Sequence, residues 1–264
     1  MFLNPDVNSM KSLPFFVVPW LPLMAAFADP NQAAADDFRI ESKVYINKDA
    51  VPSSESLTLF RGGQIYDFLN KPNETTVFNR PRGLVILLDP ARKVRTEIRA
   101  DRLTAFSDEL KAWAGKQTDP LLKFAADPRF EQSLDPSGEL LFNSPFINYR
   151  VATIKANTDA VVQQYLEFSD SYARLNALTN PGSVPPFPRL AINAVLFKQQ
   201  LIPEKVQMTM PARQRFGAKT TMRSEHSVAW RLLESDLGRI SEADEQLVTF
   251  TPVPLEQYLK APRK

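Results

Sequence analysis

Hydrophobic and polar residues alternate along the first part of the chain. Between Phe38 and Ile46, one set of alternate positions is mainly apolar and the other is polar or charged, as in a strand with one buried face. Further segments of strand character follow, separated by short sequences rich in Gly, Pro, Asn and Asp: 56–61, 64–69, 75–79, 83–89 and 92–98. Because these connections are too short for crossover helices, the pattern predicts an antiparallel meander of about six strands.

After residue 100 the apolar spacing changes to that of helices. Helices are predicted over 103–113, 120–125, 159–179 and 190–201, and another after Asp236 in which Ser241 and Asp244 form a capping box. Strands are predicted at 139–142, 146–155, 204–210 and 220–232. Since the helices are inserted into a series of strands, the predicted fold class is α+β. We expect a curved, half-barrel-like antiparallel sheet with helices packed on one face.

The N-terminal segment has the layout of a secretory signal peptide. Lys11 precedes an apolar stretch that ends in Ala26-Phe27-Ala28, a small-x-small cleavage sequence. Prolines interrupt the stretch, which argues against a membrane-spanning helix. The alternative is a buried apolar N-terminal segment.

The resulting domain prediction has three parts. We expect a signal peptide over residues 1–28 with cleavage between Ala28 and Asp29, a flexible lead over 29–37 and a single α+β domain over 38–264. Residues 1–9 are interpreted as an extension upstream of the real start. The mature chain, with no transmembrane helix, is then expected in the periplasm or outside the cell.

Composition removes several kinds of chemistry. Among 264 residues there is no Cys and one His, which excludes disulfides, thiolate metal sites, cysteine nucleophiles and multi-histidine metal sites. The 32 Lys and Arg residues nearly balance the 30 Asp and Glu residues, so no charge excess points to nucleic acid. The glycines form no nucleotide-binding motif. We therefore expect no cofactor, no metal and no nucleic-acid partner.

Catalytic candidates are few. The single histidine, His226, lies in a strand row with Met222, Val228 and Trp230, so a packed structural role is favoured over general-base catalysis. A carboxylate-dependent hydrolase needs two acidic groups, and the candidates on or beside strands are Asp67, Glu74, Asp89, Glu97, Glu225 and Asp236. Turn, loop or outward positions account for most of them. No catalytic residue is assigned, and the prediction is a non-enzymatic protein.

Basic residues recur in the meander: Arg80, Arg82, Arg92, Lys93, Arg95, Arg99 and Arg102. Acidic residues are interleaved with them, which is typical of a solvated outward strand face. A second interpretation keeps Arg92, Lys93 and Arg95 as contacts to anionic head groups, that is, as a means of peripheral envelope association.

One hairpin resembles a known family. Residues 80–90, Arg-Pro-Arg-Gly-Leu-Val-Ile-Leu-Leu-Asp-Pro, followed by the polar-alternating strand 92–98, are similar to the strand pair of the periplasmic lipoprotein-carrier (LolA-like) half-barrel family. The resemblance covers about residues 56–98, whereas the helical regions 101–132 and 159–201 are large for that family. It implies an unclosed barrel whose concave apolar face is lidded by helices and accepts acyl chains, with no catalytic residues to carry over.

These observations lead to three functional hypotheses. The first is an exported envelope protein that carries or binds a lipid, a lipoprotein or another apolar ligand; the second is a structural or protein-interaction domain with a filled core; the third is the hydrolase. For the first, the predicted ligand-lining residues are Phe60, Ile65, Phe68, Val77, Val85, Leu87, Val94, Ile98, Val206, Met208, Met210, Met222, Val228 and Trp230.

Overall fold

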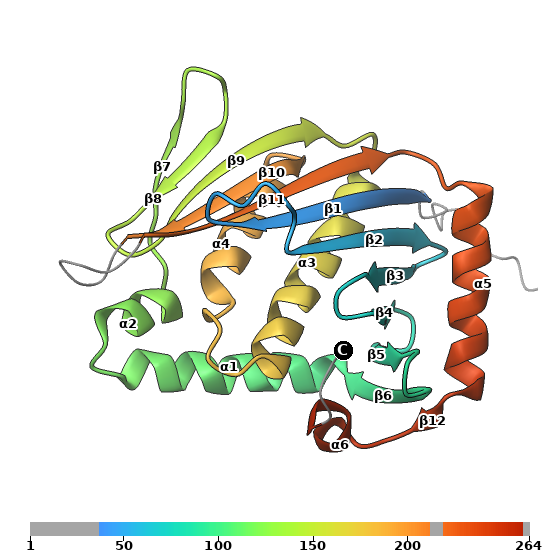
Figure 1. Ribbon diagram of the computed structural model, residues 1–264. Helices are drawn as coiled ribbons and strands as arrows, with labels where there is room; N and C mark the ends of the chain where they lie inside the picture. The colour runs from blue at the N-terminus through green and yellow to red at the C-terminus, as the bar shows by residue number, and fades with distance from the viewer. Residues whose placement is uncertain (1–36, 212–218, 261–264) are drawn as a thin grey trace, which may run out of the picture. The chain divides into compact units, whose positions relative to one another are not determined.

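The strands form one open, curved sheet. The computed structural model describes residues 37–211 and 219–260. The strands are β1 (Phe38–Ile46), β2 (Ser54–Arg61), β3 (Gln64–Leu69), β4 (Glu74–Asn79), β5 (Leu84–Asp89), β6 (Val94–Arg99), β7 (Glu131–Leu134), β8 (Leu140–Asn143), β9 (Asn148–Lys155), β10 (Leu201–Met210), β11 (Thr220–Ala229) and β12 (Thr251–Pro252). Their order is β12-β6-β5-β4-β3-β2-β1-β11-β10-β9-β8-β7 (Figure 1).

The N-terminal half of the sheet is the predicted meander. Strands β1 to β6 pair with their chain neighbours, and every pair is antiparallel. Gly62 and Gly63 turn the chain between β2 and β3 with positive φ angles of 56° and 78°, which glycine adopts without steric cost. In the β5–β6 turn the Asp89 carboxylate accepts a hydrogen bond from the backbone N–H of Arg92 at 2.9 Å. The prediction of a six-stranded meander is confirmed.

Strand β11 joins the two halves of the sheet, and β12 and β7 form its edges. Strand β11 pairs antiparallel with β1, which joins the C-terminal strands to the meander. Strand β12, absent from the predictions, is only two residues long and runs parallel to β6. Strand β7, also absent from them, has four exposed residues and pairs with β8 at the other edge. Both are short edge elements with no clear hydrophobic alternation, so the sequence pattern contains little signal for them.

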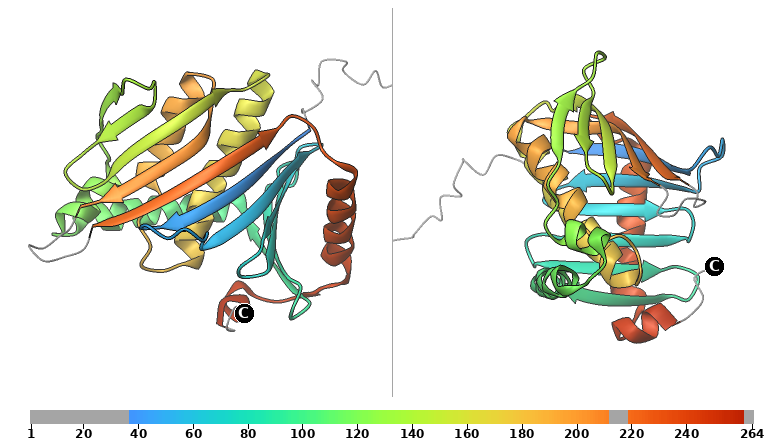
Figure 2. Two further views of the ribbon diagram at one scale, coloured as in Figure 1. Left: turned by 45° about the horizontal axis from the view of Figure 1, so that its top comes forward. Right: turned by 90° about the vertical axis from the view of Figure 1, so that its left-hand side faces the viewer.

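Three helices cover the concave face of the sheet. The helices of the chain are α1 (Ala100–Lys116), α2 (Pro120–Ala126), α3 (Asp159–Thr179), α4 (Phe187–Lys198), α5 (Glu234–Thr249) and α6 (Leu255–Lys260). Figures 1 and 2 show α1, α3 and α4 on the same side of the curved sheet. The predicted fold class, a curved α+β sheet with helices on one face, is confirmed for these helices, and α3 begins where Thr158 accepts a hydrogen bond from the N–H of Val161.

Helix α5 differs from the predictions in two ways. It packs on the other face of the sheet, where its Ile240 and Ala243 contact a cluster of outward residues of the meander that includes Tyr66 and Val77. It also begins at Glu234, so the predicted capping pair of Ser241 and Asp244 lies inside it and that prediction is wrong. The actual cap comes earlier: the carboxylate of Asp236 accepts a hydrogen bond from the N–H of Leu233 at 2.8 Å.

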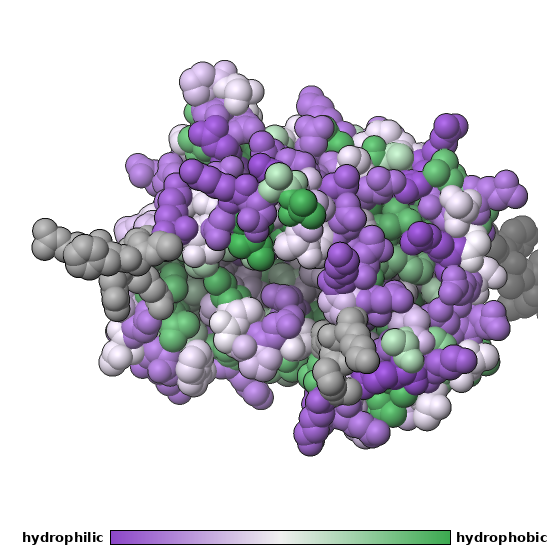
Figure 3. All heavy atoms as spheres, viewed as in Figure 1, coloured by the Kyte–Doolittle hydropathy of each residue, from purple (hydrophilic) through white to green (hydrophobic). Residues whose placement is uncertain are grey.

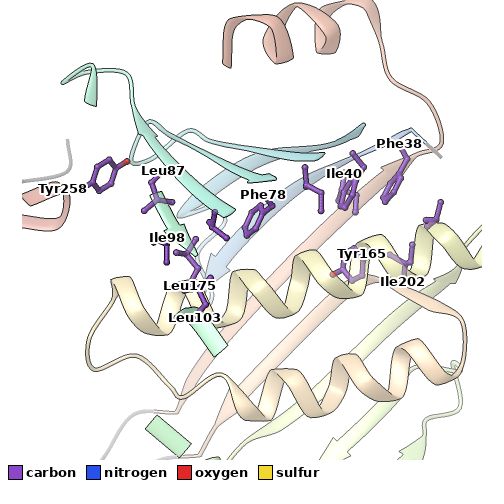
Figure 4. Packing of buried hydrophobic residues seen from close by; sticks show 14 residues of the cluster. Phe38, Ile40, Phe78, Leu87, Ile98, Leu103, Tyr165, Leu175, Ile202 and Tyr258 are labelled. Carbon is purple, nitrogen blue, oxygen red and sulfur yellow. The ribbon is translucent and has the colours of Figure 1, made fainter. Parts of the chain in front are cut away.

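The largest apolar cluster lies between the meander and α3. Phe38 stacks on Phe60 with ring centroids 3.9 Å apart, and both rings are fully buried. Figure 4 shows the members of this cluster arranged along α3, from Ile202 at one end to Leu103 and Tyr258 at the other. We call this cluster the packed region. A second cluster joins β8, β9 and β10 to α4 through Ile192 and Leu196.

The predictions made for the N-terminal 36 residues, including the signal peptide over residues 1–28 and its cleavage between Ala28 and Asp29, lie outside the described residues. Most of the flexible lead predicted over 29–37 lies outside them as well. The single domain predicted over 38–264 stays a prediction.

Candidate functional site

A cavity separates the concave face from helix α3 beyond the packed region. Its volume is about 380 Å³, within the range of small-molecule sites. Strands β1, β2, β3 and β11 form its floor, with β9 and β10 at one side. Helix α3, the residues 183–186 that connect α3 to α4, and the first turn of α4 lie over it.

The floor of the cavity is polar. Ladder pairing places Ser42 of β1 beside Ser56 of β2 on one side and beside His226 of β11 on the other. Small hydroxyl side chains occupy most of the neighbouring inward positions. The residues of this floor, which we call the polar belt, are Ser42, Ser54, Ser56, Thr58, Asp67, Ser224 and His226.

His226 is held in the belt by two serines. Its Nδ1 lies 2.8 Å from the hydroxyl of Ser42, and its Nε2 lies 3.0 Å from the hydroxyl of Ser224. Burial is the main reason why the pKa of His226 falls to about 4, and the positive charge of Arg189 lowers it further. The ring is therefore neutral at pH 7, with one nitrogen donating to a serine and the other accepting. This is a satisfied structural arrangement with two hydrogen bonds, and a weakly basic imidazole is a poor general base.

Asp67 is the acidic residue of the belt. It is 3% exposed, and it accepts a hydrogen bond from the hydroxyl of Thr58, its ladder partner, at 2.7 Å. Burial raises the pKa of Asp67 to about 6, against the effect of hydrogen bonds from Thr58 and Ser56, and the charge of Glu74 raises it further. The buried Asp67 carboxylate thus accepts its hydrogen bonds from neutral hydroxyl groups.

The remaining walls of the cavity are aromatic and aliphatic. Helix α3 contributes Tyr165, Phe168 and Tyr172, with the Phe168 and Tyr172 rings 5.7 Å apart. On the strand side, Met208 of β10 lies between Met222 of β11 and Tyr149 of β9 in the ladder. Burial raises the pKa of Tyr149 to about 12, so its phenol stays protonated and is available as a donor.

Arg189 of α4 is the cationic residue in the cavity wall. Its Nη2 lies 3.3 Å from the hydroxyl of Tyr165, which is a long hydrogen bond. Asp67 and Arg189 are the charged side chains of the described lining, one on β3 and one on α4. The cavity thus has one acidic side chain, one basic side chain, a floor of hydroxyl groups and apolar walls.

The structure distributes the predicted lining residues over several environments. Of those predicted, Val206, Met208 and Met222 line the cavity. The members that belong to the packed region or pack against it are Phe60, Ile65, Val85, Leu87, Val94, Ile98, Val228 and Trp230. Met210 packs against the cluster at β8 to β10. Phe68 and Val77 lie on the other face of the sheet beside α5, because Asp67 and Phe78 occupy the inward positions next to them.

The sequence analysis did not identify the polar belt as a possible site, although strand alternation assigns its residues to the correct face of the sheet. The alternation of Phe38, Ile40, Ser42 and Val44 predicts that all four side chains point to one face, and they do. Serine and threonine at consecutive inward positions of β2, at Ser54, Ser56 and Thr58, are the signal that a search restricted to apolar residues passes over. Small hydroxyl groups at such positions indicate a space above the sheet.

A second cavity of about 310 Å³ also has Phe168 in its lining. Ile65, Phe78 and Val85 of the meander line it together with residues of α3. Phe168 lines both cavities, and its ring makes edge-on contacts to Phe60 and Phe78.

The surface provides weaker candidates. On the face seen in Figure 3, hydrophilic residues predominate and hydrophobic residues form scattered patches. Several basic residues of the meander have acidic neighbours: Arg92 is 2.6 Å from Asp89, and Arg95 pairs with Glu97. Across residues 37–211 and 219–260, no three His, Asp or Glu side chains are grouped as metal ligands.

No model of a known protein family matches the chain, and no curated protein sequence is similar to it. Among solved structures, the chain is similar to a LolA superfamily protein from Nitrosomonas europaea at 8% identity, over 77% of this chain and 90% of that one, with a TM-score of 0.30. That protein belongs to the superfamily that residues 56–98 resemble. A likeness with this TM-score is no evidence of what the cavity binds, so the functional argument rests on the cavity itself.

Proposed function

We propose that this protein binds a small amphipathic molecule in the cavity beneath α3, as a carrier or binding protein and not as an enzyme. The observation that supports this proposal most directly is a space of about 380 Å³ with a hydroxyl floor and apolar walls. A purely apolar ligand would leave the hydrogen-bonding groups of the polar belt unused. A ligand with a polar head and an apolar tail satisfies both surfaces.

The cavity favours this function over the two alternatives. A structural domain with a filled core needs no internal space of this size. A carboxylate-dependent hydrolase needs a pair of acidic groups at the substrate, and Asp67 is the single carboxylate in the part of the lining that the structure describes. The neutral His226, held between two serines, adds no acidic partner.

The signal peptide predicted over residues 1–28 adds a location to the proposal. An exported protein with such a cavity would meet lipids, lipoproteins or other amphipathic molecules of the cell envelope in the periplasm or outside the cell. Among the residues that the structure describes, no helix has the length and apolar character needed to span a membrane. Arg92, Lys93 and Arg95 would serve peripheral association with anionic head groups in this scheme.

Displacement of a fluorescent dye tests the proposal. The purified chain is titrated with N-phenyl-1-naphthylamine, and 1-dodecanol is then added as a neutral competitor below its solubility limit. We expect the dye to become fluorescent on binding and dodecanol to displace it. The variant Ser56→Leu places a larger side chain in the floor of the cavity, so its affinity for both compounds is expected to fall about tenfold or more, equivalent to at least about 1.4 kcal/mol.

The matched control is Ser227→Leu. Ser227 is an exposed residue of β11, so the same substitution there adds an equal volume outside the cavity. The control should bind like the unchanged protein. Absence of dye and dodecanol binding to the unchanged protein, or equal binding by the two variants when circular dichroism shows both folded, would contradict the proposal.

A further inference from the structure

The carboxylate of Asp67 is buried without a cation of the protein beside it. Its described hydrogen-bond donors are the neutral hydroxyls of Thr58 and Ser56. Within the described ranges, no Lys, Arg or His nitrogen forms an ion pair with it. Burying a carboxylate in this way is unfavourable unless an opposite charge compensates it. The position lines a cavity, so a ligand can supply that charge.

Several titratable groups surround Asp67. Glu74 of β4 adds negative charge, and Tyr258 of α6 donates its hydroxyl to Glu74 at 2.9 Å. Burial raises the pKa of Tyr172 of α3, and the negative charges of Asp67 and Glu74 raise it further. Tyr172 therefore lies near both carboxylates. The cationic Arg189 contacts Tyr165, and His226 is neutral at pH 7. Asp67 is therefore the charged side chain of the described lining at this end of the cavity.

Aromatic rings complete the surroundings. Tyr172 and Phe168 of α3 both line the cavity that contains Asp67, and their rings are in contact. The faces of aromatic rings attract organic cations, and a carboxylate with aromatic neighbours is a common way to recognise an ammonium group. Hard metal ions need six or more oxygen ligands or several retained waters, which aromatic walls do not offer.

We propose that Asp67 and the neighbouring α3 aromatic residues form a binding site for the ammonium group of the ligand, so that the protein selects cationic amphiphiles: organic amines with an apolar tail. This inference rests on the proposed function, because it assigns one end of the same cavity. The hydroxyls of Thr58 and Ser56 hold the carboxylate in place, and the apolar walls around Met208 and Met222 receive the tail.

A comparison of two competitors of equal chain length tests this inference. Dodecylamine and 1-dodecanol are used to displace N-phenyl-1-naphthylamine at about pH 8, where Asp67 is ionised and the amine is protonated. We expect the unchanged protein to bind dodecylamine about tenfold or more tightly than dodecanol. In Asp67→Asn the preference is expected to disappear, because dodecylamine loses more affinity than dodecanol does.

The matched control is Asp244→Asn, which changes the net charge equally. Asp244 is exposed on α5 and accepts a hydrogen bond from Tyr66 on the other face of the sheet, so the amine preference should be retained. A second measurement needs no variant. Lowering the pH from about 8 to about 5 protonates Asp67, and the amine preference of the unchanged protein should fall with it.

The outcomes separate the two proposals. Binding of dodecanol without any amine preference would overturn the ammonium site and leave the cavity function intact. An amine preference that survives Asp67→Asn and does not change with pH would also overturn it, because the preference would then arise elsewhere. Failure of both competitors and of the dye would overturn the proposed function itself.

Discussion

Strands β1 and β2 cross two regions of the concave face that differ in how the space above them is used. At one end Phe38 and Phe60 are ladder partners, stacked and fully buried in the packed region. Four residues further along each strand, Ser42 and Ser56 are ladder partners on the same face, and the space above them is the cavity. The alternation, the pairing and the covering helix are the same in both regions.

The difference between the two regions is side-chain volume. Helix α3 covers both: its Val161 and Leu175 belong to the packed region, and its Tyr172 and Asn176 line the cavity. The rings of Phe38 and Phe60 fill the gap between sheet and helix in one place, and serine leaves it open in the other. We infer that the packed region fixes the distance between sheet and helix, so that the cavity does not need to be filled for the fold to be stable.

The strongest test of this comparison removes volume from the packed region. Phe60→Ala deletes a fully buried ring that stacks on Phe38 and contacts Phe168 edge-on. We expect the free energy of unfolding to fall by about 3–5 kcal/mol, measured by urea denaturation.

The control is an apolar truncation at the cavity. Met222→Ala removes a side chain of a residue that is 42% exposed, so a loss below about 1 kcal/mol is expected. Equal losses for Phe60→Ala and Met222→Ala would show that the cavity region is packed as tightly as the core, and the comparison would fail.

Much of the fold follows from periodicity alone. The meander was predictable because its strands are rich in apolar and β-branched residues and each turn contains glycine, proline or a side chain such as Asp89 that bonds to the backbone. The start of α5 was misplaced by several residues since Ser241 and Asp244 have the spacing of a cap, whereas the acid that caps the helix, Asp236, precedes them. Local spacing did not reveal this cap, which is supported by the burial of Asp236 beside Arg39.

The site was less predictable than the fold. Strand parity assigns residues to a face, but it does not show whether helix side chains fill the space above that face. Apolar residues such as Phe60 and Leu87 therefore looked equivalent to Met208 as ligand contacts, and they proved to be core. Asp67 was visible as an acidic residue in a strand, yet its burial depends on α3, which is about 100 residues away in the sequence.

The second prediction concerns the energetic cost of burying the ionised Asp67 carboxylate in the cavity region. A buried carboxylate whose pKa is raised from 3.8 to about 6 destabilises the folded protein when it is ionised at pH 7. Asp67→Asn is thus expected to increase the free energy of unfolding by about 2 kcal/mol in the absence of ligand, as measured by urea denaturation. Asp244→Asn should have little effect.

This second prediction connects stability with function. A residue that lowers stability in the free protein and binds the ligand is the trade-off expected at a binding site. A loss of stability in Asp67→Asn would show that the carboxylate stabilises the fold as an acceptor for Thr58 and Ser56. The cavity region would then serve the stability of the fold, as the packed region does.

The last prediction has the smallest effect at neutral pH and uses His226. Its pKa is lowered from 6.5 to about 4, so the stability it contributes is complete above about pH 6.5 and is lost as the pH falls toward 4. Asp67 has the opposite sign: its contribution is complete below about pH 3.8 and is lost as the pH rises through about 6. In the unchanged protein the two slopes nearly cancel between about pH 4 and pH 6.

Replacing His226 by Gln removes one of the two slopes. At pH 7 we expect His226→Gln to destabilise the protein by about 1 kcal/mol, because the hydrogen bonds to Ser42 and Ser224 are weakened. At about pH 4.5 the order reverses and the variant is the more stable protein, since the unchanged chain must keep His226 unprotonated to stay folded. Urea denaturation from about pH 4 to pH 7 measures both values. If the difference in free energy of unfolding between the two proteins stayed constant across this range, water would reach the imidazole freely. The polar belt would then be solvent-exposed and would not form the floor of an enclosed binding cavity.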